Sequence, residues 1–135
     1  MSYKIGIVGR GFVGGAMYEN FKDCFEVESW DVDDQKRTLN SFESFVDWSD
    51  IIFVCVPTPM KENGECDTTI VEDVVGKIAN LDRRKYVVIK STVTPGTTER
   101  LAETHRMIIG FNPEFLTKAN AVNDMRDQNR IVLGG

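Results

Sequence analysis

Three glycines and one aspartate near the start of the chain have informative types and spacing. Gly9, Gly11 and Gly14 form a Gly-x-Gly-x-x-Gly loop after a short apolar run, and Asp31 follows about 20 residues later. Gly9 permits a tight turn, Gly11 lets the backbone approach a pyrophosphate, and Gly14 lets a helix pack closely on a strand. A helix starting at this loop offers N–H groups and the positive end of its dipole to phosphates. The pattern therefore indicates a dinucleotide-binding site.

Asp31 indicates which dinucleotide this site takes. Its carboxylate would accept hydrogen bonds from the adenosine ribose hydroxyls and would repel a 2′-phosphate. We therefore expect NAD rather than NADP as the cofactor. The alternative is a glycine-rich turn between a strand and a helix with no ligand. That alternative does not explain why an acidic residue stands at this distance from the loop.

The elements that must position these residues alternate between strands and helices. The pattern predicts strands at residues 5–8, 25–30, 51–56, 86–90, 107–110 and 130–133. It predicts helices at residues 12–22, 68–81, 95–105 and 114–122, with short turns or helices at 33–39 and 41–46. Pro95 is expected as the first residue of its helix. This alternation predicts an α/β fold with a doubly wound, mostly parallel sheet, the Rossmann fold.

Ligands of such sheets bind beyond the carboxyl ends of the strands, which directs attention to the loops there. Val56-Pro57-Thr58-Pro59 ends the third predicted strand, and its two prolines fix the backbone. The motif either holds Thr58 at the sheet edge for a ligand or only stiffens the strand exit. Both interpretations remain open.

Hydroxyl and carboxylate side chains follow the next two strands. Ser91, Thr92 and Thr94 precede a predicted helix. Helix capping explains Thr94 but not Ser91 and Thr92, which we expect over the cofactor. Glu114 follows Pro113 at a helix start, where the dipole favours a carboxylate. The alternative, functional interpretation is that the Glu114 carboxylate faces the nicotinamide end of the cofactor, where it acts as a base or holds a water molecule.

Composition narrows the class of protein. A length of 135 residues predicts one domain, and a net charge of −5 argues against general nucleic-acid binding. No apolar run approaches the roughly 18 residues of a membrane span, and the amino terminus does not read as a signal peptide. The three cysteines, Cys24, Cys55 and Cys66, lack the spacing of a metal site. We expect a cytoplasmic protein without metal or membrane partner.

Several further motifs, in order, resemble the nucleotide-sugar dehydrogenase family. The resemblance covers the glycine-rich loop and most of the later chain. Its remaining segments are Val56 to Pro59, Gly64 to Asp67, Lys90 to Val93 with Gly96-Thr97, Asn112 to Leu116, Ala121-Val122, Asp124 and Arg130 to Val132.

The resemblance implies oxidation of the C6 alcohol of a UDP-sugar such as UDP-glucose to a carboxylate, with NAD used twice. Thr58 and Thr92 would line the nicotinamide side, and Lys36 would lie near the adenosine ribose. Thr92 and Glu114 would be catalytic, holding a water and moving protons respectively. The expected cofactor contacts are Gly9, Gly11, Phe12, Val13, Gly14, Asp31, Lys36, Val56, Pro57, Thr58, Ser91 and Thr92.

The chain departs from the family pattern in two respects. Thr117-Lys118-Ala119 stands where the family has Arg-Glu-Gly. Lys118 cannot replace the glutamate as a base without a large pKa shift, so we expect it to face solvent rather than to bind substrate. The family's nucleophilic cysteine, central dimerisation helix and UDP-binding domain also find no counterpart in residues 1–135. We therefore expect an NAD-binding domain that does not complete the oxidation alone.

Three functions stay open at this point. The first is the NAD-binding part of a nucleotide-sugar dehydrogenase. The second is a standalone NAD(H)-binding module or a split-enzyme subunit that acts through a C-terminal partner chain. The third is another dehydrogenase of the hydroxyacid superfamily, against which the motifs at residues 91–93 and 113–116 argue.

Overall fold

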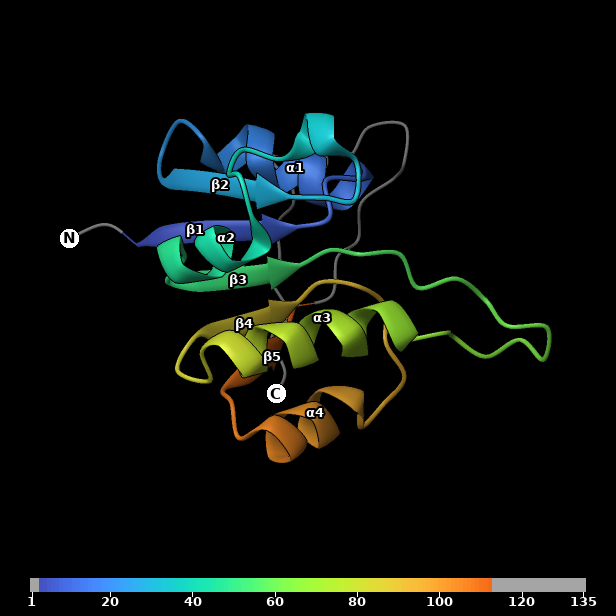
Figure 1. The fold of residues 1–135 in the computed structure, drawn as a ribbon. Helices are drawn as coiled ribbons and strands as arrows, with labels where there is room; N and C mark the ends of the chain where they lie inside the picture. Colours follow the sequence, from blue (N-terminus) through green and yellow to red (C-terminus); the bar gives the residue numbers. More distant parts are fainter. Residues whose placement is uncertain (1–2, 113–135) are drawn as a thin grey trace.

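The computed structural model describes residues 3–112 and contains a parallel sheet covered by helices on both faces (Figure 1). Its strands are β1 (Lys4–Val8), β2 (Glu26–Trp30), β3 (Ile51–Val54), β4 (Tyr86–Ile89) and β5 (Ile109–Phe111). Its helices are α1 (Phe12–Phe21), α2 (Phe42–Trp48), α3 (Thr69–Leu81) and α4 (Thr97–His105), with a 3₁₀ turn η1 (Asp34–Lys36). The helix predicted at 114–122 and the strand predicted at 130–133 lie outside the described residues.

The sheet has the strand order β2-β1-β3-β4-β5, and every neighbouring pair is parallel. This confirms the doubly wound fold. Strand order reverses between β1 and β3, because α1 returns to β2 on one side and α3 returns to β4 on the other. Ligands of such sheets bind at this reversal, beyond the carboxyl ends of the strands.

Each face of the sheet has its own apolar core. Helices α2, α3 and α4 cover one face, where Phe45, Val75 and Leu101 pack among buried strand residues (Figure 1). Helix α1 covers the other face through Met17, which packs with Ile5 and Ile7. Strands buried on both faces explain the continuous apolar runs in the sequence.

The predicted start of α4 is wrong by two residues. The helix begins at Thr97, and Pro95 lies in the preceding turn. Gly96 has φ 87° and ψ −10°, and the Thr97 N–H donates to the Thr94 carbonyl at 3.1 Å. This is the geometry of a type II turn, in which Pro and Gly hold the two central positions. The capping role expected of Thr94 is also wrong, because Gly96 is the N-cap and no side chain caps this helix.

Two strand boundaries differ from the prediction by two residues, and the other differences are of one residue. Strand β5 begins at Ile109 rather than at residue 107, because the Met107 N–H still donates to Ala102 of α4 at 3.1 Å. Strand β3 ends at Val54, two residues before the predicted end.

Glu72 of α3 forms an ion pair with Arg100 of α4. Replacing Glu72 therefore tests how much this contact contributes to the stability of the fold. Its Oε2 accepts from the Thr68 hydroxyl at 2.7 Å, and its Oε1 pairs with Arg100 Nη1 at 2.9 Å. The Thr68 hydroxyl, followed by Arg100, lowers the pKa of Glu72. A lowered pKa stabilises the fold above the unfolded-state pKa of about 4.3, and this contribution disappears as pH falls below the folded-state value.

We expect Glu72→Gln to lower the free energy of unfolding by about 0.5 kcal/mol at neutral pH, because the ion pair is accessible to solvent. Urea titrations of both proteins at several pH values should show this difference shrinking below about pH 4. A difference that persists undiminished in acid would show that the carboxylate charge is not its source.

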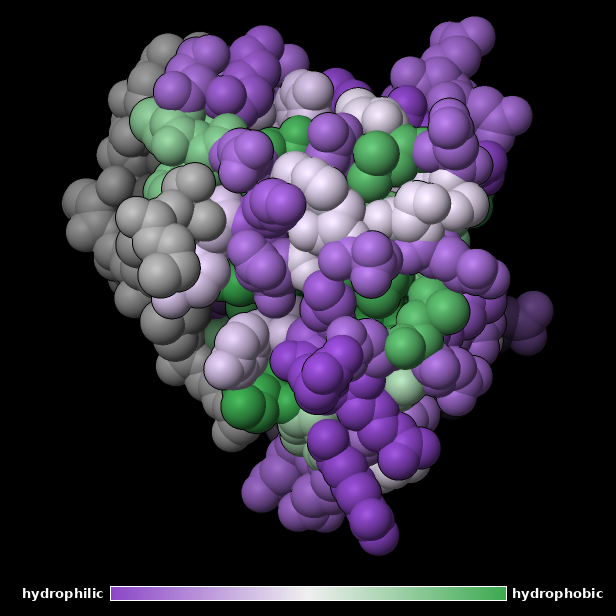
Figure 2. All heavy atoms as spheres, turned by 60° about the vertical axis from the view of Figure 1, so that its left-hand side comes forward, coloured by the Kyte–Doolittle hydropathy of each residue, from purple (hydrophilic) through white to green (hydrophobic). Residues whose placement is uncertain are grey.

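The face at which the strands begin is hydrophilic. Figure 2 shows this side with apolar side chains in separate spots among polar ones. None of the helices in residues 3–112 combines the length and the hydropathy that crossing a bilayer requires. A cavity lies at the opposite edge of the sheet, where the strands end.

Candidate functional site

A cavity of about 940 Å³ lies along the carboxyl edge of the sheet. Its walls come from the glycine-rich loop, the ends of β2, β3 and β4, η1 and α3. The structure thus brings together most residues predicted from the sequence: Gly9, Gly11, Phe12, Val13, Asp31, Lys36, Val56, Pro57, Thr58, Ser91 and Thr92. Gly14 does not line this cavity, and Glu114 lies outside the described residues.

Two of the three loop glycines are required by packing within the chain. Gly9 has φ +90°, and a Cβ there would lie 2.7 Å from the Cys55 carbonyl oxygen. A Cβ on Gly14 would lie 1.7 Å from the Gly9 carbonyl oxygen. Backbone cannot yield to such contacts, so Gly14 serves the close approach of α1 to β1 that the sequence predicts.

Gly11 differs, because apart from its chain neighbours no atom of residues 3–112 lies within 4 Å of the position its Cβ would take. Protein packing among the described residues therefore does not explain a glycine there. Gly11 is also the N-cap of α1, with no side chain capping the helix and no acidic residue in its first turn. The first turn of a helix leaves N–H groups without partners inside the helix. Open space above such N–H groups fits a pyrophosphate.

The Asp31 carboxylate is held beside the glycine-rich loop by hydrogen bonds from backbone N–H groups. Its Oδ2 accepts from the Arg10 N–H at 2.7 Å, and its Oδ1 accepts from the Asp33 N–H at 2.9 Å. A carboxylate can accept about four hydrogen bonds, so each oxygen can still accept one from a ribose hydroxyl. The carboxylate is thus oriented and still able to bind.

Three cationic residues lie on the segments that flank or contact Asp31, and the sequence pattern does not mark two of them, Arg10 and Arg37. Arg37 donates from Nε to the Asp31 carbonyl at 2.7 Å and stacks on Trp30, 4.1 Å from the ring centre. The Arg10 guanidinium lies 3.9 Å from the centre of the Tyr18 ring. Lys36 is the third. Arg10 could have been noticed as a charged residue inside the glycine motif.

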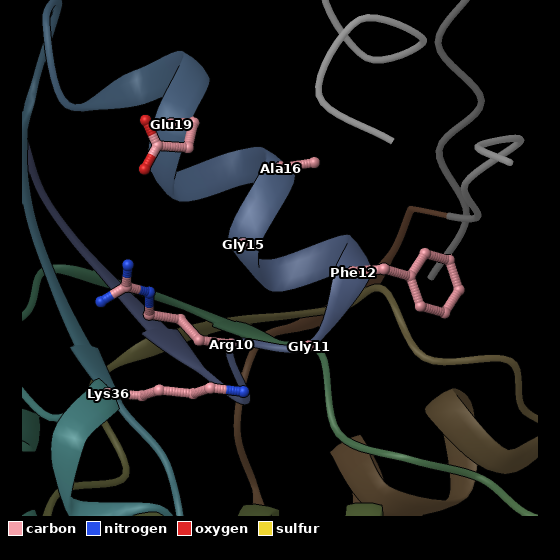
Figure 3. A pocket seen from close by; sticks show the side chains of 7 residues that line it. All are labelled: Arg10, Gly11, Phe12, Gly15, Ala16, Glu19 and Lys36. Carbon is pink, nitrogen blue, oxygen red and sulfur yellow. The ribbon is translucent and has the colours of Figure 1, made fainter. Parts of the chain in front are cut away.

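Lys36 borders the main cavity and a smaller one of about 290 Å³ beside α1 (Figure 3). Its side chain extends from η1 toward the backbone of Arg10 and Gly11, whereas the Phe12 ring points to the other side. Within residues 3–112, the Lys36 ammonium group has no hydrogen-bond or ion-pair partner. It is placed to meet a negatively charged ligand at the glycine-rich loop.

The loops after β3 and β4 hold each other in place. Ser91 is buried, and its hydroxyl donates to the Val56 carbonyl at 2.7 Å, so it serves the structure of this edge. Thr92 is exposed. The Cys66 thiol donates to the Thr92 carbonyl at 3.2 Å and approaches the Thr58 carbonyl at 3.8 Å. Cys66, which had no assigned role, therefore joins the loops that carry the two threonines.

Lys90 is a buried cation at the same edge. Its side chain lines the cavity, and its ammonium group donates to the Asn112 side-chain oxygen. The Asn112 N–H in turn donates to the Ile89 carbonyl at 3.0 Å. This pair connects the ends of β4 and β5. Residues 3–112 contain no cluster of three His, Cys, Asp or Glu side chains suited to a metal ion.

Comparison with known proteins identifies relatives of this site. Residues 36–135 match the family described as "UDP-glucose/GDP-mannose dehydrogenase family, NAD binding domain". UDP-glucose 6-dehydrogenase of Rickettsia prowazekii (strain Madrid E) is 39% identical over 101 residues, which cover 70% of this chain and 22% of that protein.

Two solved structures share the fold over nearly the whole chain. The GDP-mannose dehydrogenase of Pseudomonas aeruginosa has a TM-score of 0.83 and 27% identity, over 96% of this chain and 40% of that one. The UDP-glucose dehydrogenase of Pyrobaculum islandicum has a TM-score of 0.87 and 25% identity, over 99% of this chain and 41% of that one. The chain thus spans less than half the length of these relatives. The family match begins at Lys36, after the glycine-rich loop.

Proposed function

This chain belongs to the UDP-glucose/GDP-mannose dehydrogenase family and contains its NAD-binding domain. On that basis we propose that it holds NAD along the carboxyl edge of the sheet, within an enzyme that oxidises a nucleotide sugar. The observation that carries this proposal is the open space at Gly11, above an uncapped helix start and beside the oriented carboxylate of Asp31.

Each part of NAD has a matching part of the cavity in this proposal. The adenosine ribose binds Asp31, with Lys36 close by. The pyrophosphate lies over Gly11 at the start of α1. The nicotinamide then extends toward the loops of Thr58 and Thr92, which end β3 and β4. Supporting this order, these groups line one cavity from the end of β2 to the end of β4.

When bound, NAD supplies a hydride acceptor, and the residues of this chain bind and orient it. The rigid exit at Pro57 and the Cys66 contact to Thr92 hold the two threonines at a fixed separation. The exposed Thr92 hydroxyl is available to position a water molecule. Glu114 is proposed, from the family resemblance, to move protons there.

The substrate is proposed to be a UDP-glucose-like nucleotide sugar, oxidised at C6 to the carboxylate. That reaction needs a nucleophile for its covalent step. Because the relatives are more than twice as long as their matched regions, we propose that further sequence supplies the nucleophile and sugar pocket. In this proposal, the further sequence belongs either to the same polypeptide or to a C-terminal partner chain. A cytoplasmic location fits, since Cys24, Cys55 and Cys66 form no disulfide with one another.

The test is NADH formation from UDP-glucose. We expect no turnover by the 135-residue chain alone, and turnover when a separate polypeptide carrying the nucleophile and UDP-sugar pocket is added. Thr92→Ala in the combined system should reduce the rate by about tenfold or more. Turnover by the isolated chain would contradict this division of labour. NAD binding without turnover in any combination would favour the standalone binding module.

A further inference from the structure

We propose that Arg37 selects adenine at the cofactor site, because its guanidinium plane is a surface on which a purine ring stacks. This inference rests on the proposed function and deepens it, since that function places the adenosine ribose at Asp31. The base is the part of the adenosine half that carries identity, because ribose and phosphate groups are common to all nucleotides. Arg37 would therefore determine which nucleotide this end of the cavity prefers.

The Arg37 side chain is fixed by three contacts. Its Nε donates to the Asp31 carbonyl at 2.7 Å, and its Nη1 pairs with Asp34 Oδ1 at 2.8 Å. Its guanidinium carbon lies 4.1 Å from the centre of the Trp30 ring. That ring in turn packs edge-on against Phe42. A side chain already held in place loses little further freedom when a ligand binds to it, so Arg37 is preorganised.

The faces of this guanidinium group matter more than its edges. Its N–H groups lie in the plane, so the contacts to Asp31 and Asp34 orient the plane without covering a face. The Trp30 ring covers one face. The Arg37 side chain is still 30% exposed, and it lines the cavity that Asp31 also lines. Guanidinium planes and nucleic-acid bases stack on each other, and the face opposite Trp30 is the one that a base in the cavity meets.

Two exposed apolar side chains lie in the same cavity. Val32 directly follows Asp31 and is 94% exposed, and Ile70 in the first turn of α3 is 41% exposed. Both line the cavity with Arg37. A flat base would remove apolar surface of these side chains from water, which is favourable. The base is joined to the ribose that Asp31 is proposed to bind, so it must lie near the residues that adjoin Asp31.

The expected effect is a preference for a purine over a pyrimidine. A cation stacked on an aromatic ring at a partly exposed site changes a binding equilibrium by about fivefold. A purine has a larger ring system than a pyrimidine, so it covers more of the guanidinium plane. ADP and UDP share their ribose and diphosphate and differ only in the base. We expect the chain to bind ADP about fivefold more tightly than UDP.

The test measures dissociation constants of ADP, UDP and NAD for the 135-residue chain by calorimetry. We expect Arg37→Ala to lower the ratio of the UDP constant to the ADP constant by about fivefold, and to weaken NAD binding by a similar factor. Arg37→Lys keeps the charge but lacks the plane, so it should lower the ratio as well. Arg84→Ala is the matched control, because Arg84 also pairs with a nearby aspartate, Asp82, but does not line the cavity. It should leave the ratio unchanged.

The outcomes separate this inference from the proposed function. If the unsubstituted chain binds neither NAD nor ADP, the proposed function fails. If it binds NAD but shows no preference for ADP over UDP, the proposed function stands and the inference is overturned. If Arg37→Ala weakens ADP and UDP equally, Arg37 only supports the backbone at Asp31, and the inference is again overturned. Should Arg37→Ala not fold, Arg37→Lys decides, because its ammonium group can still pair with Asp34. An unchanged ratio in that variant overturns the inference.

Discussion

Replacing Gly11 with aspartate should abolish NAD binding and leave the fold at least as stable. The backbone at Gly11 has φ −74°, outside the left-handed region that favours glycine, and apart from its chain neighbours no atom of residues 3–112 lies within 4 Å of the position of a Cβ. Aspartate is a preferred N-cap, so the helix should gain up to about 1 kcal/mol. The same carboxylate would occupy the proposed pyrophosphate position and repel it. We expect the affinity for NAD to fall by at least about 100-fold, or roughly 3 kcal/mol.

Gly14→Ala provides the contrast within the same motif. Its new methyl group would lie 1.7 Å from the Gly9 carbonyl oxygen, so α1 must move away from β1. We expect a loss of about 3 kcal/mol or more in the free energy of unfolding. Urea titration measures stability for both variants, and calorimetry measures NAD affinity for Gly11→Asp. Normal NAD affinity in a folded Gly11→Asp protein would mean that the pyrophosphate lies elsewhere.

Replacing Asp31 with serine should reverse the preference for NAD over NADP. The carboxylate would no longer accept from the ribose hydroxyls or repel a 2′-phosphate. The Arg10 backbone N–H and the Arg37 side chain contact Asp31 and would remain, and Lys36 lines the same cavity. We expect NAD affinity to fall by about tenfold, as the loss of about 1.5 kcal/mol would give. NADP affinity should rise by a similar factor, as one new charge-assisted contact of about 1.5 kcal/mol would give.

Two further variants make this test specific. Asp33→Ser is the matched control, since Asp33 accepts from the Gln35 N–H and does not line the cavity. It should keep the preference for NAD. Adding Lys36→Ala to Asp31→Ser should remove most of the gain in NADP affinity. If Asp31→Ser changes neither affinity, the adenosine ribose does not bind at the end of β2.

The fold could be predicted because its signals are local. Apolar residues of α3, such as Val71, Val75 and Ile78, recur at helical spacing and are all fully buried. Short apolar runs between the helices mark strands that are covered on both faces. The observed start of α4 differs from the predicted one because Pro95, taken alone, is typical of the first residue of a helix. The pair Pro95-Gly96 is typical of a type II turn. Gly96 has a left-handed backbone conformation, so α4 cannot extend through it toward Pro95.

The site could be predicted only in part, because several of its contacts join distant segments. The spacing between the glycine-rich loop and Asp31 is typical of a dinucleotide-binding site, so the sequence alone predicts their role. The Cys66 contact to Thr92 and the Lys90 contact to Asn112 depend on which loops the sheet order makes neighbours. No local pattern records such pairs. Gly11 and Gly14 look alike in the sequence, and only the structure separates a glycine kept for packing from one that leaves room for a ligand.

The central claim is that the glycine-rich loop, Asp31 and the ends of β3 and β4 form one NAD site. The most direct test follows the backbone amide signals of the 135-residue chain by NMR during titration with NAD. We predict saturable shifts that share one dissociation constant at Gly11, Asp31, Thr58 and Thr92. Amides at the opposite edge of the sheet, such as Tyr86, should stay unchanged. No saturable shift at millimolar NAD, or shifts confined to the opposite edge, would contradict the claim.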